Sequence, residues 1–255
     1  MATVRVDGLD IHFETTGSQS PAVCLVHGTG GSAGVWTRQL DGLADLARVI
    51  ALDLPGHGRS EGAVPSRIED AALVVARFLD ALGVPKVVIG GHSMGGAVAQ
   101  QFALDYPERV DGLMLIGTGA RLRVLPRLLD LLASDYPEGI RLLMDLAVGP
   151  GAPARLKDSL HRLTAANPPG VVLADLRACD AFDVLDRIGT VRTPTLALCG
   201  EEDQLTPPKY TRFFGEHVAG AATVIVSASG HYVQMERPEE TTAALRRFVQ
   251  ALPRD

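Results

Sequence analysis

A serine in a glycine-rich turn is the strongest sign of chemistry in this sequence. Residues 91–96 read Gly-His-Ser-Met-Gly-Gly and place Ser93 at the centre of a Gly-x-Ser-x-Gly pattern. The segment follows a short apolar run, 86–89, and opens a stretch, 95–106, that has the composition of a helix. A serine between a strand and a helix lies on a sharp, strained turn that exposes its hydroxyl. We therefore expect Ser93 to be a nucleophile rather than part of an ordinary glycine-rich loop.

A serine hydroxyl at neutral pH needs a base to accept its proton, and the base needs an acid to orient it. After a turn of this kind, the acid and the histidine follow the serine in the chain. Asp203 lies 110 residues after Ser93 (203 − 93), in an acidic loop behind a strand-like run, where Glu201 and Glu202 are competing acids. His231 follows the last strand-like run, in a Ser-Gly-His segment. We predict a triad of Ser93, His231 and Asp203.

The oxyanion of an acyl-transfer reaction needs backbone N–H donors. Residues 27–31 read His-Gly-Thr-Gly-Gly and follow the strand-like run 22–26, where a loop can supply one donor. We predict Thr29 as this donor, with Gly30 as the alternative, and Met94, which follows the nucleophile, as the second donor.

Strands and helices must alternate along the chain to place these residues at one edge of a sheet. Short apolar runs predict eight strands, at 3–6, 9–14, 22–26, 48–52, 86–89, 113–116, 195–199 and 223–226. Helical patterns separate most of these runs, and the later runs are almost wholly apolar, as in a parallel sheet covered on both faces. The sequence therefore predicts an α/β protein with a doubly wound, mostly parallel eight-stranded sheet.

Residues 120–189 interrupt this alternation, because the segment contains only helical pieces separated by proline- and glycine-rich turns. We predict a core of residues 1–119 and 190–255 with a helical insertion at 120–189. The insertion has nine basic and nine acidic residues and is rich in leucine. Its candidate pocket residues, each equally able to pack within the insertion, are Leu122, Leu125, Leu128, Leu131, Leu142 and Met144. Trp36 has two open roles, as a pocket wall or as core packing.

Composition excludes several classes of function. The chain has 255 residues and a net charge of −6 without a long basic run, so we expect neither nucleic acid nor a membrane as partner. Three scattered cysteines argue against a disulfide framework and against a metal site. The N-terminus lacks the apolar run of a signal peptide, and no stretch is long and apolar enough to span a membrane. We expect a cytoplasmic monomer or homodimer that needs no cofactor.

Five motifs together resemble the α/β-hydrolase superfamily over nearly the whole chain outside the insertion. They are residues 27–30, 53–60 (Asp-Leu-Pro-Gly-His-Gly-Arg-Ser), 91–96, 200–203 and 230–231. Within the superfamily the chain is similar to small microbial carboxylesterases, enol-lactonases and meta-cleavage C–C hydrolases. The resemblance implies the α/β-hydrolase fold and identifies the insertion as the family's helical cap, with its inner face forming the substrate pocket.

These observations predict a serine hydrolase that cleaves small, mainly uncharged carboxylic esters through an acyl-enzyme. An enol-lactonase or C–C hydrolase with the same triad is the alternative, and a ligand receptor on the same fold is a further one. Arg121 and Arg123 lie where the insertion begins. They are either solvated charges or residues that bind a substrate carboxylate. Binding of a carboxylate would favour the lactonase.

Overall fold

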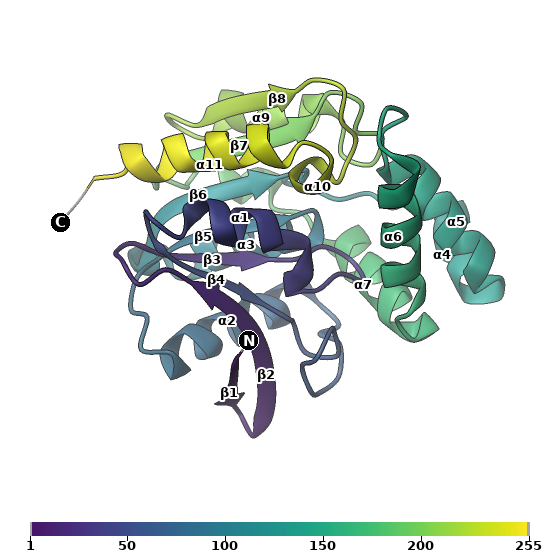
Figure 1. The fold of residues 1–255 in the computed structure, drawn as a ribbon, viewed down its shortest axis with the longest axis horizontal. Helices are drawn as coiled ribbons and strands as arrows, with labels where there is room; N and C mark the ends of the chain where they lie inside the picture. The colour runs from purple at the N-terminus through teal and green to yellow at the C-terminus, as the bar shows by residue number, and fades with distance from the viewer. Residues whose placement is uncertain (1, 254–255) are drawn as a thin grey trace.

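An eight-stranded sheet forms the centre of the molecule (Figure 1), for which a computed structural model describes residues 2–253. Its strands are β1 (Ala2–Val6), β2 (Leu9–Thr16), β3 (Ala22–Val26), β4 (Arg48–Leu52), β5 (Val87–His92), β6 (Val110–Ile116), β7 (Thr195–Gly200) and β8 (Ala222–Val226). They lie in the order β1-β2-β4-β3-β5-β6-β7-β8. The β1–β2 and β2–β4 pairs are antiparallel, and all other neighbouring pairs are parallel. The predicted mostly parallel, eight-stranded fold is confirmed.

Two strands extend beyond the apolar runs that predict them. Strand β5 continues through Gly90 and Gly91 to His92, and strand β6 begins at Val110. Both extensions are paired in the sheet, since Gly90 lies opposite Met114 and Val110 lies opposite Val87. Glycine has low strand propensity, so pairing with the neighbouring strand decides the conformation of Gly90 and Gly91.

Helices cover both faces of the sheet. They are α1 (Thr37–Leu43), α2 (Ile68–Ala81), α3 (Met94–Asp105), α4 (Pro126–Ser134), α5 (Tyr136–Ala147), α6 (Ala154–Ala165), α7 (Pro169–Ala181), α8 (Leu185–Ile188), α9 (Pro208–His217), α10 (Val233–Glu236) and α11 (Pro238–Ala251), with short 3₁₀ turns η1 (Ala33–Trp36) and η2 (Pro107–Arg109). Residues of α2, α3 and α9 share one buried cluster with the sheet, and residues of α1 and α11 share another on the opposite face.

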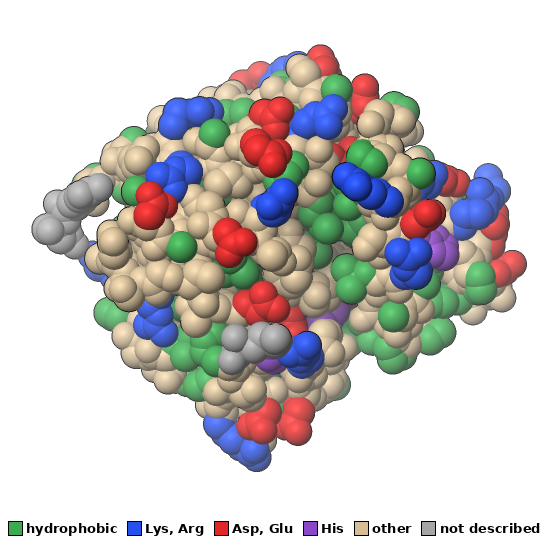
Figure 2. Space-filling view, viewed as in Figure 1, with side chains coloured by type: hydrophobic (Ala, Val, Ile, Leu, Met, Phe, Trp, Pro, Cys, Tyr) green, Lys and Arg blue, Asp and Glu red, His purple; other side chains and the backbone are tan. Residues whose placement is uncertain are grey.

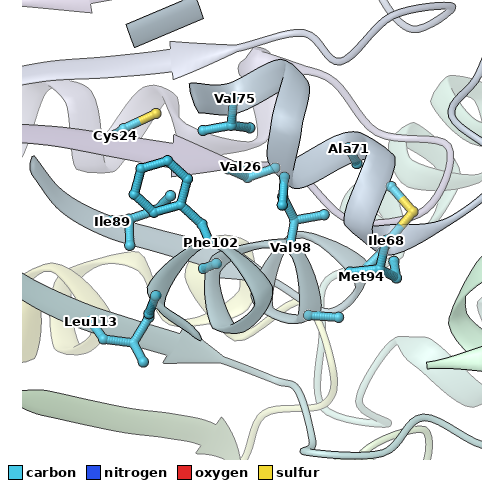
Figure 3. Packing of buried hydrophobic residues seen from close by; sticks show 14 of the residues in the cluster. Cys24, Val26, Ile68, Ala71, Val75, Ile89, Met94, Val98, Phe102 and Leu113 are labelled. Carbon is cyan, nitrogen blue, oxygen red and sulfur yellow. The ribbon is translucent and has the colours of Figure 1, made fainter. Parts of the chain in front are cut away.

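The first of these clusters supports the turn that holds Ser93. Figure 3 shows Val75 of α2 and Phe102 and Val98 of α3 packed over the strand residues Cys24 and Ile89. All five side chains are fully buried. Burial of side chains of this size contributes about 1.5–3 kcal/mol each, so β5 and α3 are fixed relative to one another.

Helices α4–α7 lie together at the end of the sheet toward which β3 points (Figure 1). They pack around a hydrophobic cluster separate from the two on the sheet, with Leu132, Ile140 and Leu160 among its buried members. They occupy most of the segment 120–189 and stand over the carboxyl ends of the parallel strands. In open α/β sheets this edge holds the ligand site.

The surface shows no segregation of charge on the face in view, where basic and acidic side chains are interspersed (Figure 2). Within residues 2–253, no helix is both long and apolar enough to cross a bilayer.

Candidate active site

Ser93 occupies the sharp turn between β5 and α3. Its backbone has φ +54° and ψ −116°, in the left-handed half of conformational space that side chains other than glycine rarely enter. A Cβ at Gly91 would lie 2.0 Å from the Gly95 carbonyl oxygen, and a Cβ at Gly95 would lie 2.2 Å from the Val26 carbonyl oxygen. Glycine is therefore required on both sides of Ser93. The turn leaves Ser93 half-buried, with its side chain lining a cavity.

His231 and Asp203 form a buried hydrogen-bonded pair beside this turn. The His231 Nδ1–H donates to Asp203 Oδ2 at 2.9 Å, and the two residues are each 3% exposed. The other carboxylate oxygen, Oδ1, accepts the backbone N–H groups of Leu205 at 2.9 Å and Thr206 at 2.8 Å. The Thr206 hydroxyl donates to Oδ2 at 2.8 Å. Four donors thus fix the carboxylate in one orientation.

This environment keeps Asp203 ionised. Burial alone would raise the pKa of the Asp203 carboxyl, but the charge and hydrogen bond of His231 and the bonds from Thr206 outweigh burial. The pKa of Asp203 is consequently lowered. A carboxylate that stays charged can hold the imidazole with its Nδ1 protonated and its Nε2 free to accept a proton.

The competing acids of the same loop lie elsewhere. Glu201 is exposed to solvent, and Glu202 donates its backbone N–H to the Ser229 carbonyl oxygen at 2.9 Å. In the part of the chain that the structure describes, neither carboxylate hydrogen-bonds to His231. Asp203 is therefore the acid that the fold brings to the histidine.

Ser93 and His231 line one cavity of ≈ 30 Å³ together with Thr29 and Tyr232. The Gly30 N–H, the alternative oxyanion donor, is engaged by the Asp175 carboxylate at 2.8 Å. Within residues 2–253, no acceptor is found for the N–H groups of Thr29 and Met94. These two groups remain available to a developing oxyanion, which favours the predicted pair.

A buried histidine packs behind the base. The His92 Nε2–H donates to the His231 carbonyl oxygen at 2.9 Å, and the two rings lie 4.6 Å apart between centroids. Burial, reinforced by the charge of His231, lowers the pKa of His92 to about 3. Burial also lowers the pKa of His27 to about 4, with a further contribution from His57. Both rings are neutral at physiological pH.

The two neutral histidines make the protein sensitive to acid. As the pH falls, a histidine whose pKa is lowered by burial is protonated in the unfolded chain before it is protonated in the folded one. The free energy of unfolding therefore decreases as the pH drops from about 6.5 toward the pKa of the folded state. His57 acts in the opposite sense, because its pKa is raised and its contribution to stability is lost as the pH rises.

We expect His92→Gln to reduce the decrease in the free energy of unfolding between pH 6.5 and pH 4. Urea unfolding at a series of pH values measures this, with His217→Gln, at an exposed site, as control. Parallel pH curves for wild type and His92→Gln would contradict the assignment.

A second, apolar cavity of ≈ 70 Å³ continues from Ser93 beneath the helices α4–α7. Its lining residues are Ser93, Leu122, Arg123, Val124, Leu125, Leu128, Leu143, Leu146, Leu176, Cys179, Leu205 and Thr206. Leu122 and Leu125 are thus at the cavity, although Leu125 is half exposed. Both cavities are far below the ~300–1,000 Å³ of sites for drug-sized ligands, so they fit small groups.

Four of the candidate pocket residues line neither cavity: Trp36, Leu131, Leu142 and Met144. Trp36 is fully buried and packs in the core cluster of α1 and α11 with Val35 and Leu40, so of its two open roles the structure shows core packing and not a pocket wall. Leu142 packs against the hydrophobic cluster of α4–α7, the other role open to it, while its neighbours on α5, Leu143 and Leu146, line the cavity. A helix turns by about 100° per residue, so adjacent leucines face different directions.

The two arginines at the start of the segment 120–189 differ in their surroundings. Arg121 is 3.5 Å from Asp183 and lines a separate surface hollow with Lys209 and Tyr210. Arg123 lines the apolar cavity beside Ser93, and no ion-pair partner is found for it within residues 2–253. Of the two arginines, only Arg123 therefore lines the cavity that contains Ser93.

Two contributors to the site are missing from the sequence prediction. Thr206 is one, and the other is Asp175, which is 1% exposed on α7. Asp175 lies among buried apolar residues of the same helix, between Val172 and Leu176, and an acid at such a position is the signal that could have revealed it. Among residues 2–253, no three His, Cys, Asp or Glu side chains converge to hold a metal ion.

Known proteins share this architecture. A family model described as "alpha/beta hydrolase fold" matches residues 21–238. A solved structure of a thermophilic esterase is 33% identical, covers 98% of this chain and 96% of its own, and superposes with a TM-score of 0.88. The structure of Est816, an N-acyl homoserine lactone degrading enzyme, is 30% identical over 97% of this chain and all of its own, with a TM-score of 0.85.

A curated relative from Cupriavidus necator is the dihydrolipoyllysine-residue acetyltransferase component of an acetoin cleaving system. It is 31% identical over 96% of this chain and 67% of its own length. An enol-lactonase and a meta-cleavage product hydrolase are further structures with the same fold. The resemblance drawn from the five sequence motifs is confirmed.

Proposed function

Because this chain belongs to the alpha/beta hydrolase fold family, we propose that it is a serine hydrolase that cleaves small, mainly uncharged carboxylic esters. One observation carries the proposal. A histidine hydrogen-bonded to a buried, ionised aspartate shares a cavity with a serine on a strained turn. The resemblance to an esterase of known structure, at 33% identity, supports the same bond type.

The residues of this cavity suffice for acyl transfer. The Ser93 hydroxyl attacks the acyl carbon while His231 Nε2 accepts its proton, and Asp203 stabilises the resulting imidazolium. The N–H groups of Thr29 and Met94 receive the negative charge that develops on the carbonyl oxygen. His231 then returns the proton to the leaving alcohol, and an acyl-Ser93 ester remains. Water repeats the sequence with His231 as base, releasing the acid and restoring the serine.

The size of the cavities limits the acyl chain. A methylene that becomes buried contributes about 0.8 kcal/mol, or roughly fourfold in kcat/KM, but only while space remains. We expect kcat/KM for p-nitrophenyl esters to rise from acetate to butyrate or hexanoate and then fall. Steady-state hydrolysis over an even-numbered series up to palmitate tests this. Leu128→Ala, which enlarges the apolar cavity, should move the optimum to a longer chain, whereas an unchanged optimum would show that the acyl group binds elsewhere.

Arg123 is the residue that could make the enzyme prefer charged over uncharged esters. If its guanidinium binds a substrate carboxylate, a half-ester should exceed its neutral diester by tenfold or more, since a charged hydrogen bond contributes ~1.5–3 kcal/mol. Comparing the two esters in wild type and in Arg123→Ala decides the matter. A half-ester preference that disappears in the variant would contradict an enzyme for uncharged esters and favour an enol-lactonase.

A lactonase is the second candidate function. A lactone is a cyclic ester that the same acyl-enzyme chemistry opens, and a lactone-degrading enzyme is 30% identical to this chain. Including acyl homoserine lactones and vinylogous diketones beside the esters separates lactone and C–C cleavage from ester cleavage. Steady turnover of any of these substrates would exclude a receptor that only binds its ligand.

A further inference from the structure

A carboxylate from helix α7 reaches across to the loop that carries Thr29. Asp175 Oδ2 accepts the Gly30 N–H at 2.8 Å and the His57 Nε2–H at 2.9 Å. The carboxylate is 1% exposed, and α7 belongs to the layer of helices above the sheet edge. The contact therefore joins three segments that are far apart in the sequence.

The charge of Asp175 is balanced within the site. Both ring nitrogens of His57 face oxygen acceptors, because Nδ1 lies 3.0 Å from the Pro55 carbonyl oxygen and Nε2 lies 2.9 Å from the carboxylate. Burial would lower the pKa of His57, but the hydrogen bond and charge of Asp175 outweigh burial and raise it. The Asp175 carboxylate and the Pro55 carbonyl oxygen thus both favour the protonated form of the His57 ring. A buried pair of this kind stabilises the fold little in comparison with apolar packing, so its presence calls for another role.

The loop at Gly30 is held on its other side as well. The Asn167 amide Nδ2 donates to the Gly30 carbonyl oxygen at 2.8 Å. Gly30 has φ +60°, and a Cβ at this position would lie 3.1 Å from the methyl groups of Thr164 and Val172. Both peptide groups that flank the Gly30 Cα are thus fixed by residues of the segment 120–189.

We propose that Asp175 is a positioning residue for the oxyanion loop: its carboxylate holds the Gly30 N–H and so directs the neighbouring N–H of Thr29 into the cavity of Ser93. The inference rests on the proposed function, in which Thr29 is an oxyanion donor. The Gly30 N–H and the Thr29 carbonyl belong to one peptide group. Holding this peptide group fixes the ψ angle of Thr29. It thereby fixes the direction in which the Thr29 N–H points.

The test separates transition-state stabilisation from substrate binding and from stability. Removing one oxyanion donor costs about 10²–10³ in kcat, and we expect Asp175→Ala, which releases the donor without deleting it, to lower kcat for p-nitrophenyl butyrate by about 10–100-fold. KM should change by less than about threefold. The affinity for a trifluoromethyl ketone, which forms a hemiketal oxyanion with Ser93, should weaken by the same factor as kcat/KM. Asp175→Asn keeps an oxygen that can accept the Gly30 N–H, so its kcat should stay within about tenfold of wild type.

Two further variants exclude a purely structural explanation. Asp180→Ala is the matched control, because Asp180 lies on the same helix and accepts a backbone N–H, that of Val124 at 3.0 Å, away from the oxyanion loop. It should retain kcat within about threefold. The double variant Asp175→Leu/His57→Leu removes both buried charges together, a replacement that is often neutral or stabilising. It should recover the melting temperature lost in Asp175→Ala without recovering kcat.

The outcomes are distinct. Unchanged kcat in Asp175→Ala, or recovery of kcat together with the melting temperature in the double variant, would overturn the positioning role. A loss confined to KM would overturn it too, since that pattern reports substrate binding. If the wild type does not turn over the ester at all, the proposed function fails and this inference fails with it.

Discussion

Ser93→Ala should lower kcat/KM for ester hydrolysis by on the order of 10⁴-fold or more while leaving the protein folded. The hydroxyl is the only protein group in the proposed mechanism that bonds to the acyl carbon, so its loss leaves oxyanion stabilisation and binding alone. The turn itself depends on the backbone and on the glycines around it, which the substitution retains. Kinetics with p-nitrophenyl butyrate measure the loss, and the melting temperature reports the fold.

A covalent probe provides the control for contamination. A fluorophosphonate should phosphonylate the wild-type protein with loss of fluoride, adding the mass of the probe less HF, and peptide mapping should place the adduct at Ser93. Ser134→Ala, at an exposed serine on α4, should keep full activity. If purified Ser93→Ala keeps more than a few per cent of wild-type activity and is still labelled, the nucleophile is another residue.

Asp203→Asn should cost several orders of magnitude in kcat, about 10⁴-fold if the site follows the serine–histidine–aspartate pattern. The amide oxygen can still accept the N–H groups of Leu205 and Thr206, so the loop should keep its shape. The amide nitrogen, however, would face His231 Nδ1 as a donor. The imidazole would then hold its proton on the nitrogen that must accept one from Ser93. Steady-state kinetics of the purified variant measure the effect.

The neighbouring acids give this experiment its matched controls. Glu201→Gln and Glu202→Gln remove the same charge from the same loop, and each should cost less than about tenfold in kcat. A Glu202→Gln variant as inactive as Asp203→Asn would move the role of the acid to Glu202.

Much of the fold and the candidate triad could be predicted because their signals are local. The turn at Ser93 is encoded by glycines within a few residues, and the strands before Ser93 and Asp203 are continuous apolar runs. Parallel strands bring their carboxyl ends to one edge, so residues that follow them meet there. Whether a side chain points into the cavity could not be predicted in the same way. Trp36 and Leu142 have the expected type and neighbourhood, but the faces they present depend on how whole helices pack.

The Asp175 contact shows why other parts of the site could not be predicted. Its partners Gly30 and His57 are 145 and 118 positions away in the chain. A charged residue on an apolar helix face indicates that a partner exists, but it does not indicate which one. In the sequence, His57 stands out only as part of the motif 53–60, because its partner comes from a helix whose packing only the fold defines.

The contact between Asp175 and Gly30 also bears on how separable the two parts of this chain are. Segments such as 120–189 invite exchange between relatives as a way of changing which substrates are accepted. In this protein the segment supplies both the carboxylate and the amide that hold the Gly30 peptides. A grafted segment without an acceptor at the position of Asp175 would bring a new pocket but leave the chemistry beneath it impaired. If Asp175 positions the oxyanion loop as proposed, an exchange of this segment should change substrate selectivity and kcat together, and an active chimera should keep an acceptor at position 175.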